Sequence, residues 1–270
     1  MQDKAPSSGP IRAMFLGTCR MHDPEHTIQK SSGLHTRRTP HRVHSPGQVL
    51  AFIRHMNGTA PYRPETVHLV SDHAAEQVLA LGQDRQDLLD KLEDLRSVWP
   101  SFAVHVIEIS ALREFEADLG GTSLMVNIFA ERDQERYADE IARQAAAGVS
   151  VPVAPISMRR LTQHQVLIGM RQIKAELKGK PVIWVSHIRP GGTEERDAVV
   201  NAVRLLGANT LRAGAAALGD RFFDPSEVAA EMGRAAFFQK NGEDLDHMTP
   251  AAAERLGQIY LGMIRDILGS

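Results

Sequence analysis

Three side chains at opposite ends of the sequence could supply a nucleophile, a general base and the carboxylate that orients the base. Cys19 closes the run Ile11-Arg-Ala-Met-Phe-Leu-Gly-Thr-Cys19, in which an apolar stretch leads into a glycine. A reactive side chain directly after a strand and a tight turn is exposed to substrate. Asp244 stands three residues before His247 and just ahead of Thr249-Pro250, a helix start. Its carboxylate can bind the imidazole Nδ1–H and leave Nε2 as a base for the thiol.

Each of these residues also has a purely structural interpretation. Most lone cysteines are small buried hydrophobic residues, and Asp244 and His247 could serve only to cap the last helix. A thiol has an ordinary pKa of about 8.5, so a nucleophilic cysteine needs a neighbouring base. The pairing of Cys19 with an Asp-x-x-His motif therefore favours the chemical interpretation.

Composition excludes several classes of protein. The chain has 270 residues, of which 43% are hydrophobic and 24% charged, as in ordinary globular proteins. A net charge of −2 gives no electrostatic footprint for nucleic acid or an anionic membrane. One cysteine excludes an internal disulfide framework and indicates a reducing, cytoplasmic location, and no apolar run is long enough to span a membrane.

The order of apolar segments predicts an α/β fold. Strands are expected at 11–16, 66–70, 103–109, 182–185 and 221–223, and helices at 45–57, 84–98, 161–177, 195–211, 225–232 and 249–267. This alternation predicts a doubly wound, mostly parallel five-stranded sheet in a three-layer α/β/α sandwich. We expect a disordered tail at 1–10, a single domain at 11–270 and a long loop at 21–45. An insertion at about 110–160 either shapes a substrate pocket or covers the sheet edge without a ligand role.

Histidines and arginines gather in the expected loop and after the expected fourth strand. A metal site could draw on His22, Asp23, His26, His41 and His44, but their spacing matches no standard signature, so we expect no metal. We expect instead that this loop, with Arg37, Arg38 and Arg42, faces an anionic or hydroxyl-rich substrate, a solvated surface being the alternative. His187 and Arg189 leave the strand at 182–185 on the same edge as Cys19.

The two motifs together resemble a known family. Gly17-Thr18-Cys19 and Asp244-x-x-His247-Met-Thr are similar to the first and last blocks of the SGNH (GDSL-like) hydrolase superfamily, and residues 185–190 resemble its GSCFA-type branch. A similar Gly-Asn-Cys turn occurs in a bacterial capsular polysaccharide acetyltransferase family. The resemblance implies a flavodoxin-like sheet and a Cys19–His247–Asp244 triad. It also implies hydrolysis of a small-molecule or saccharide ester, or O-acyl transfer with acetyl-CoA as a donor and no other cofactor.

The sequence departs from the family pattern at the nucleophile and at the oxyanion hole. Cys19 replaces the family serine and Thr18 its aspartate, so the Thr18 hydroxyl is the second candidate nucleophile. The family places a glycine after the second strand and an asparagine after the third, where this chain has Ser71-Asp72-His73 and Glu108-Ile109-Ser110. Losing one oxyanion donor typically costs about a hundredfold in rate. Substitute donors or substrate contacts are expected among Gly17, Thr18, Arg20, Ser110, His187 and Arg189. The alternative function is a non-catalytic ligand-binding protein on the same frame.

Overall fold

Five parallel strands form the central sheet of the computed structural model, which describes residues 12–32, 34–71, 85–149, 151–191 and 195–269. The strands are β1 (Arg12–Leu16), β2 (His35–Arg38), β3 (Val104–Ile109), β7 (Val182–Ser186) and β8 (Arg221–Phe223), in the order β2-β1-β3-β7-β8. All four neighbouring pairs are parallel. This is the flavodoxin-like order, whose switch point lies between β1 and β3. The predicted fold class is confirmed.

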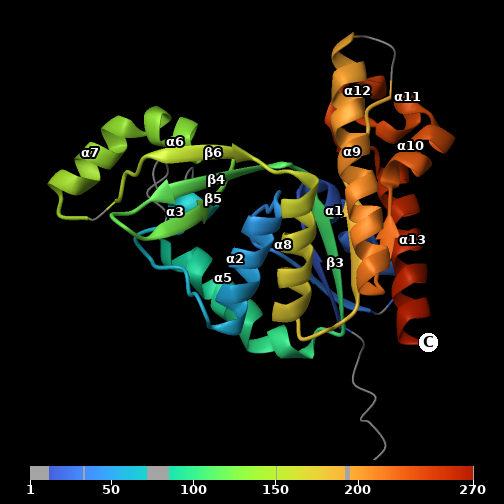
Figure 1. The fold of residues 1–270 in the computed structure, drawn as a ribbon, viewed down its shortest axis with the longest axis horizontal. Coiled ribbons are helices and arrows are strands. Elements are labelled where there is room, and N and C mark those ends of the chain that lie inside the picture. Colours follow the sequence, from blue (N-terminus) through green and yellow to red (C-terminus); the bar gives the residue numbers. More distant parts are fainter. Residues whose placement is uncertain (1–11, 33, 72–84, 150, 192–194, 270) are drawn as a thin grey trace, which may run out of the picture.

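Helices cover both faces of this sheet (Figure 1). The larger helices are α1 (Cys19–Ser32), α2 (Pro46–Asn57), α5 (Arg85–Val98), α8 (Gln163–Glu176), α9 (Glu195–Leu218), α10 (Pro225–Met232) and α13 (Pro250–Leu268). Shorter elements are α3 (Val67–Val70), the 3₁₀ turn η2 (Trp99–Ser101), α11 (Arg234–Phe237), α12 (Gln239–Gly242) and β9 (Asp244–Met248). No helix among the described residues is long and apolar enough to cross a membrane.

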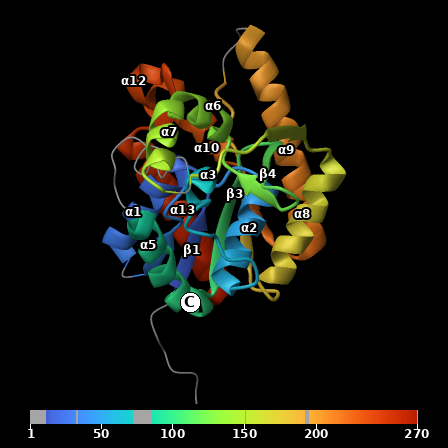
Figure 2. The same cartoon turned by 90° about the vertical axis from the view of Figure 1, so that its left-hand side faces the viewer.

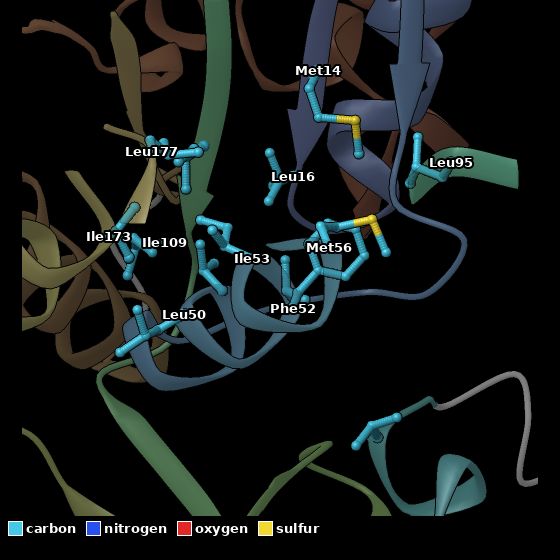
Figure 3. Close-up of a cluster of buried hydrophobic side chains, with 14 of the residues drawn as sticks. Met14, Leu16, Leu50, Phe52, Ile53, Met56, Leu95, Ile109, Ile173 and Leu177 are labelled. Carbon is cyan, nitrogen blue, oxygen red and sulfur yellow. The ribbon is translucent and has the colours of Figure 1, made fainter. Parts of the chain in front are cut away.

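Alternation along each strand divides the core into two layers. Met14 and Leu16 of β1 face a cluster with α2, α5 and α8, whose side chains gather under the sheet in Figure 3. Ala13 and Phe15 face the opposite cluster, which includes α1 and α13. The site-bearing strands β1, β3 and β7 are therefore buried on both faces, as expected of a parallel sheet.

Residues 113–160 form a second unit beside the main sheet. Its antiparallel strands are β4 (Arg113–Asp118), β5 (Ser123–Val126) and β6 (Ile156–Arg160), in the order β5-β4-β6, with α6 (Ala130–Arg136) and α7 (Ala138–Ala146) between β5 and β6. The three strands lie over the N-terminal end of α2 (Figures 1 and 2). Glu114 of β4 accepts a hydrogen bond of 2.6 Å from the Gly47 backbone N–H at that end. The contact fixes this unit beside the carboxyl edge of the main sheet.

The second strand of the sheet was predicted at the wrong place. Residues 21–45, expected as a loop, form α1, β2 and the segment that follows β2, whereas 66–70 contains the single helical turn α3. β2 is an edge strand in which only Thr36 is buried, so its sequence carries little apolar signal. A short apolar run such as 66–70 does not distinguish strand from helix. The expected disordered tail at 1–10 lies outside the described residues.

Candidate functional site

A buried carboxylate on the neighbouring strand β3 holds the turn that carries Cys19. Glu108, near the end of β3, accepts hydrogen bonds from the Thr18 backbone N–H at 2.9 Å and from the Thr18 hydroxyl at 2.7 Å. Only glycine fits at position 17, because a Cβ there would lie 2.8 Å from the Glu108 Cβ. Cys19 follows as the first residue of α1, where the helix dipole favours negative charge. Thr18 is thus a buried anchor of the turn, which argues against its hydroxyl as the nucleophile.

A polar network continues from Glu108 across the site. His187 Nδ1 lies 3.1 Å from the other Glu108 oxygen, and Arg20 Nη1 lies 2.8 Å from both ring nitrogens of His187. Arg20 Nη2 donates to the Leu245 carbonyl at 2.6 Å. The chain Thr18–Glu108–His187–Arg20–Leu245 therefore connects both sides of Cys19 to the segment that carries the Asp-x-x-His motif. We call it the anchoring network.

Burial and charge set the protonation of this network. Burial raises the pKa of Glu108, but His187, the Arg20 guanidinium and the Thr18 hydroxyl lower it more, to about 2. Burial and the positive charge of Arg20 lower the pKa of His187 to about 4. At neutral pH the carboxylate is therefore ionised and the imidazole neutral. A neutral His187 can donate Nδ1–H to Glu108 and accept from Arg20 at Nε2.

A short hairpin presents Asp244 and His247. Residues 238–239 pair with β9 through Phe238–Met248 and Gln239–Asp244, and Lys240 and Asn241 turn the chain in the left-handed region. Both Asp244 oxygens lie 3.1 Å from His247 Nδ1, so the Nδ1–H faces the carboxylate. His247 Nε2 is then the basic nitrogen. The half-exposed imidazole is therefore held in the tautomer that a general base requires.

The last helix is capped by neither Asp244 nor His247. The Thr249 side chain accepts from the Ala252 N–H, and Pro250 occupies the first turn of α13. The capping interpretation of the Asp-x-x-His motif is therefore unnecessary, because the adjacent threonine performs that role.

A cavity of about 860 Å³ brings the two motifs together. Its lining includes Thr18, Cys19, Arg20, Ser110, His187 and His247 from the expected site. Gly17 and Asp244 are not among the lining residues, but Asp244 is hydrogen-bonded to the lining residue His247. Arg189 is not among the lining residues: its guanidinium is 3.0 Å from the Asp224 carboxylate, and its N–H donates to Ser226. Arg189 therefore holds β7 to the start of α10.

Sequence reasoning missed several residues of this site. Glu108 interrupts the apolar run of β3, and a buried carboxylate at the end of a strand is itself a signal of a polar site. The segment after β2 is held to the β1 turn by the bond from the Val43 N–H to the Gly17 carbonyl, and it carries Arg42 and His44 to the cavity. His44 Nδ1 lies 3.0 Å from the Ser110 hydroxyl. Of the residues after the expected second strand, Asp72 and His73 lie outside the described residues.

The histidines of the N-terminal segment lie in different environments. His41 packs between the rings of Phe52 and Tyr62, whereas His26 is exposed on α1. Within the described part of the chain, no group of three or more His, Cys, Asp or Glu side chains could hold a metal ion.

Comparison with known proteins gives one family match and distant structural neighbours. A family model described as the TviD N-terminal domain matches residues 133–262, a segment that includes Asp244 and His247 but not Cys19. A search of curated proteins gives no match. A candidate SGNH hydrolase from Slackia heliotrinireducens aligns with a TM-score of 0.44 and 12% identity over 95% of this chain and 99% of that chain. Axe2, an acetylxylan esterase from Geobacillus stearothermophilus, aligns with a TM-score of 0.41 and 11% identity over 94% of each chain.

Proposed function

We propose that this protein is an acyl hydrolase or O-acyltransferase that forms a covalent acyl-enzyme on Cys19. The observation that carries the proposal is that Cys19 and His247 line one cavity while His247 is hydrogen-bonded to Asp244. A nucleophile, a base and an orienting carboxylate are the three parts that covalent acyl transfer requires. Their approach from the two ends of the chain agrees with the resemblance of the Gly-Thr-Cys and Asp-x-x-His motifs to SGNH hydrolases.

The proposed reaction has two half-reactions. His247 Nε2 takes the Cys19 thiol proton as the sulfur attacks the ester or thioester carbonyl carbon, and the carbonyl oxygen becomes an oxyanion. The oxyanion collapses, the bond to the leaving alcohol or thiol breaks, and His247 returns the proton to that group. Water or an acceptor alcohol, deprotonated by His247, then attacks the carbonyl carbon of the Cys19 thioester. The bond from that carbon to the Cys19 sulfur breaks, His247 returns the proton to the sulfur, and an acid or a new ester is released. Asp244 holds the imidazole and stabilises its protonated form.

The groups around Cys19 indicate how the oxyanion could be held. Arg20 already donates to Leu245 and contacts His187, so its role in this scheme is to position the turn. The Ser110 hydroxyl and His44 line the cavity as a hydrogen-bonded pair at the end of β3 and are the donors that we assign to the oxyanion. They take the place of the family glycine and asparagine.

Single-turnover acylation tests the proposal. Because Cys19 is the only cysteine, a mass increase on incubation with an activated acetate ester or acetyl-CoA can be assigned to it by peptide mapping. We expect the adduct in the native protein and none in Cys19→Ala. His247→Ala should slow acylation by about a hundredfold or more. His164→Ala, which removes an exposed histidine of α8 that does not line the cavity, should not change the rate.

A non-catalytic ligand-binding protein is the second candidate function. The observation in its favour is that neither the segment after β2 nor the end of β3 supplies the glycine and asparagine of the family's oxyanion hole. An absence of any acyl adduct with activated esters between pH 6 and 9, in a protein whose fold is intact, would establish this candidate over the enzyme.

A further inference from the structure

The cavity that contains Cys19 is strongly cationic. Its described lining residues include five arginines and no aspartate or glutamate. The arginines come from separate parts of the chain: Arg20, Arg42, Arg113, Arg160 and Arg204. Arginine recognises carboxylate and phosphate groups in bidentate geometry.

Three of the five arginines, Arg20, Arg42 and Arg204, interact with other groups inside the protein. Arg20 belongs to the anchoring network, where the ionised Glu108 lowers the cost of burying its charge. Arg204 donates to the Ile188 carbonyl. The guanidinium groups of Arg20 and Arg204 therefore help to build the site.

Arg113 and Arg160 are different, because they face each other as like charges. They are direct register partners on the antiparallel strands β4 and β6, and both are exposed. Among the described residues, neither guanidinium has a hydrogen-bond or ion-pair partner. Like charges directly opposite on neighbouring strands destabilise a sheet.

The next register pair shows the ordinary arrangement on the same two strands. Glu114 lies opposite Arg159, and their side chains form an ion pair of 2.6 Å with the carboxylate buried. Successive residues of a strand point to opposite faces. One face of β4 and β6 thus carries a compensated Glu–Arg pair, whereas the face that lines the cavity carries two uncompensated arginines. A bound anion would supply the missing charge.

We propose that the substrate of this site carries, besides its ester or thioester, a carboxylate or phosphate group that binds between Arg113 and Arg160. The cavity is in the upper part of the usual size range for ligand sites and is larger than a simple acetate ester requires. Leu112 and Leu161, each adjacent to one of the two arginines, give the same wall an apolar part. This assignment of substrate class rests on the proposed function, whereas anion binding itself does not.

Anion binding is tested first and without catalysis. Thermal unfolding is measured with inorganic phosphate and, separately, with benzoate, at constant ionic strength. We expect one or both anions to raise the Tm of the native protein and of Cys19→Ala, because a ligand that binds only the folded state stabilises it. The shift should vanish in the Arg113→Gln/Arg160→Gln double variant and persist in Arg171→Gln, which removes an exposed arginine of α8 outside the cavity. Without ligand, the double variant should unfold at the same or a higher temperature than the native protein, because a repulsion is removed.

Substrate preference is tested second, with matched acetate esters of phenol, 4-hydroxybenzoate and 4-hydroxyphenyl phosphate. We expect acylation of Cys19 to be at least about tenfold faster with one of the two anionic esters than with the neutral ester. In the double variant that ratio should fall to about one. The faster of the two anionic esters shows whether the site prefers a carboxylate or a phosphate.

The outcomes separate this inference from the proposed function. If an anion raises the Tm only when Arg113 and Arg160 are present, and no acyl adduct forms, the anion site is supported and the proposed acyl-transfer activity is refuted. Acylation with no preference among the three esters, together with no anion-dependent shift in Tm, would retain the enzyme and overturn the anion site. A Tm shift that survives in the double variant would also overturn it.

Discussion

Replacing Glu108 by glutamine should destabilise the protein by about 3 kcal/mol at pH 7. Folding lowers the pKa of this carboxyl from 4.5 to about 2, a difference that corresponds to about 3 kcal/mol of stabilisation of the ionised form. The carboxylate is fully buried, so solvent screening does not reduce this figure. Removing one partner of a buried ion pair costs a similar amount, about 3–5 kcal/mol, because the other charge stays buried. Here that remaining charge is Arg20, which is 7% exposed.

The assay is urea unfolding at pH 7 and at pH 3.5. Between its folded and unfolded pKa values the unfolded state of the native protein binds more protons, so Glu108 contributes stability above about pH 4.5 that is lost as the pH falls toward 2. His187 acts in the same direction between pH 6.5 and 4, because its folded pKa is also lowered. The glutamine variant should therefore be less stable at pH 7 and lose less stability on acidification.

An exposed glutamate serves as the matched control for this prediction. Glu93 lies 3.3 Å from Arg96 on the surface of α5. Glu93→Gln should change the stability by less than about 1 kcal/mol, because exposed ion pairs contribute little. The idea that Glu108 is ionised and buried is refuted if Glu108→Gln costs less than about 1 kcal/mol of stability at pH 7. It is also refuted if the variant loses as much stability on acidification as the native protein.

Three further substitutions test the elements that hold the site. Gly17→Ala should destabilise by about 1–3 kcal/mol, because the new Cβ would lie 2.6 to 2.9 Å from side-chain atoms. Gly262→Ala has nothing within 4 Å and should not destabilise, so equal urea midpoints for the two variants would contradict the close approach. Ser45→Ala removes the side-chain cap of α2 and should cost about 1 kcal/mol, measured by thermal unfolding. Asp220→Ala leaves Lys174 without its carboxylate 2.5 Å away and should cost about 3–5 kcal/mol, measured by the same assay; a loss below 1 kcal/mol would show that the lysine finds other partners.

The parts of the fold that the sequence predicts are those with strong local signals. α2 begins at Ser45-Pro46 with a capping box and ends before Gly58 in the left-handed conformation, as its residues indicate. β3 and β7 are buried along their whole length, so their continuous apolar runs identify them. In these elements local propensity and tertiary burial favour the same structure.

Tertiary contacts decide the elements that the sequence does not reveal. α1 includes Pro24 and buries a carboxylate, Glu25, which contacts Thr36 of β2. Burial raises the pKa of Glu25, and the hydrogen bond from Thr36 lowers it by a smaller amount. α1 and β2 stabilise each other through this polar contact, and a polar contact between two elements leaves no apolar periodicity in either sequence.

In the candidate site, too, some contacts follow from local sequence and others depend on tertiary structure. The spacing of Asp244 and His247 is local, and the hydrogen bond between them follows from it. By contrast, the position of Glu108 under the Cys19 turn depends on the pairing of β1 with β3. The like-charged pair of Arg113 and Arg160 depends on the register of β4 against β6. Neither arrangement can be known until the strands are paired.

The anchoring network also determines when during synthesis this site can exist. Arg20 bonds to a carbonyl 225 residues further along the chain, and Thr18 to a carboxylate 90 residues away. While Leu245 is still inside the ribosome, the nascent chain therefore has the Cys19 thiol without its proposed base and the Arg20 guanidinium without its Leu245 acceptor. The chemistry that we propose therefore requires the hairpin at 238–248 to have left the ribosome and to have docked against the Cys19 turn.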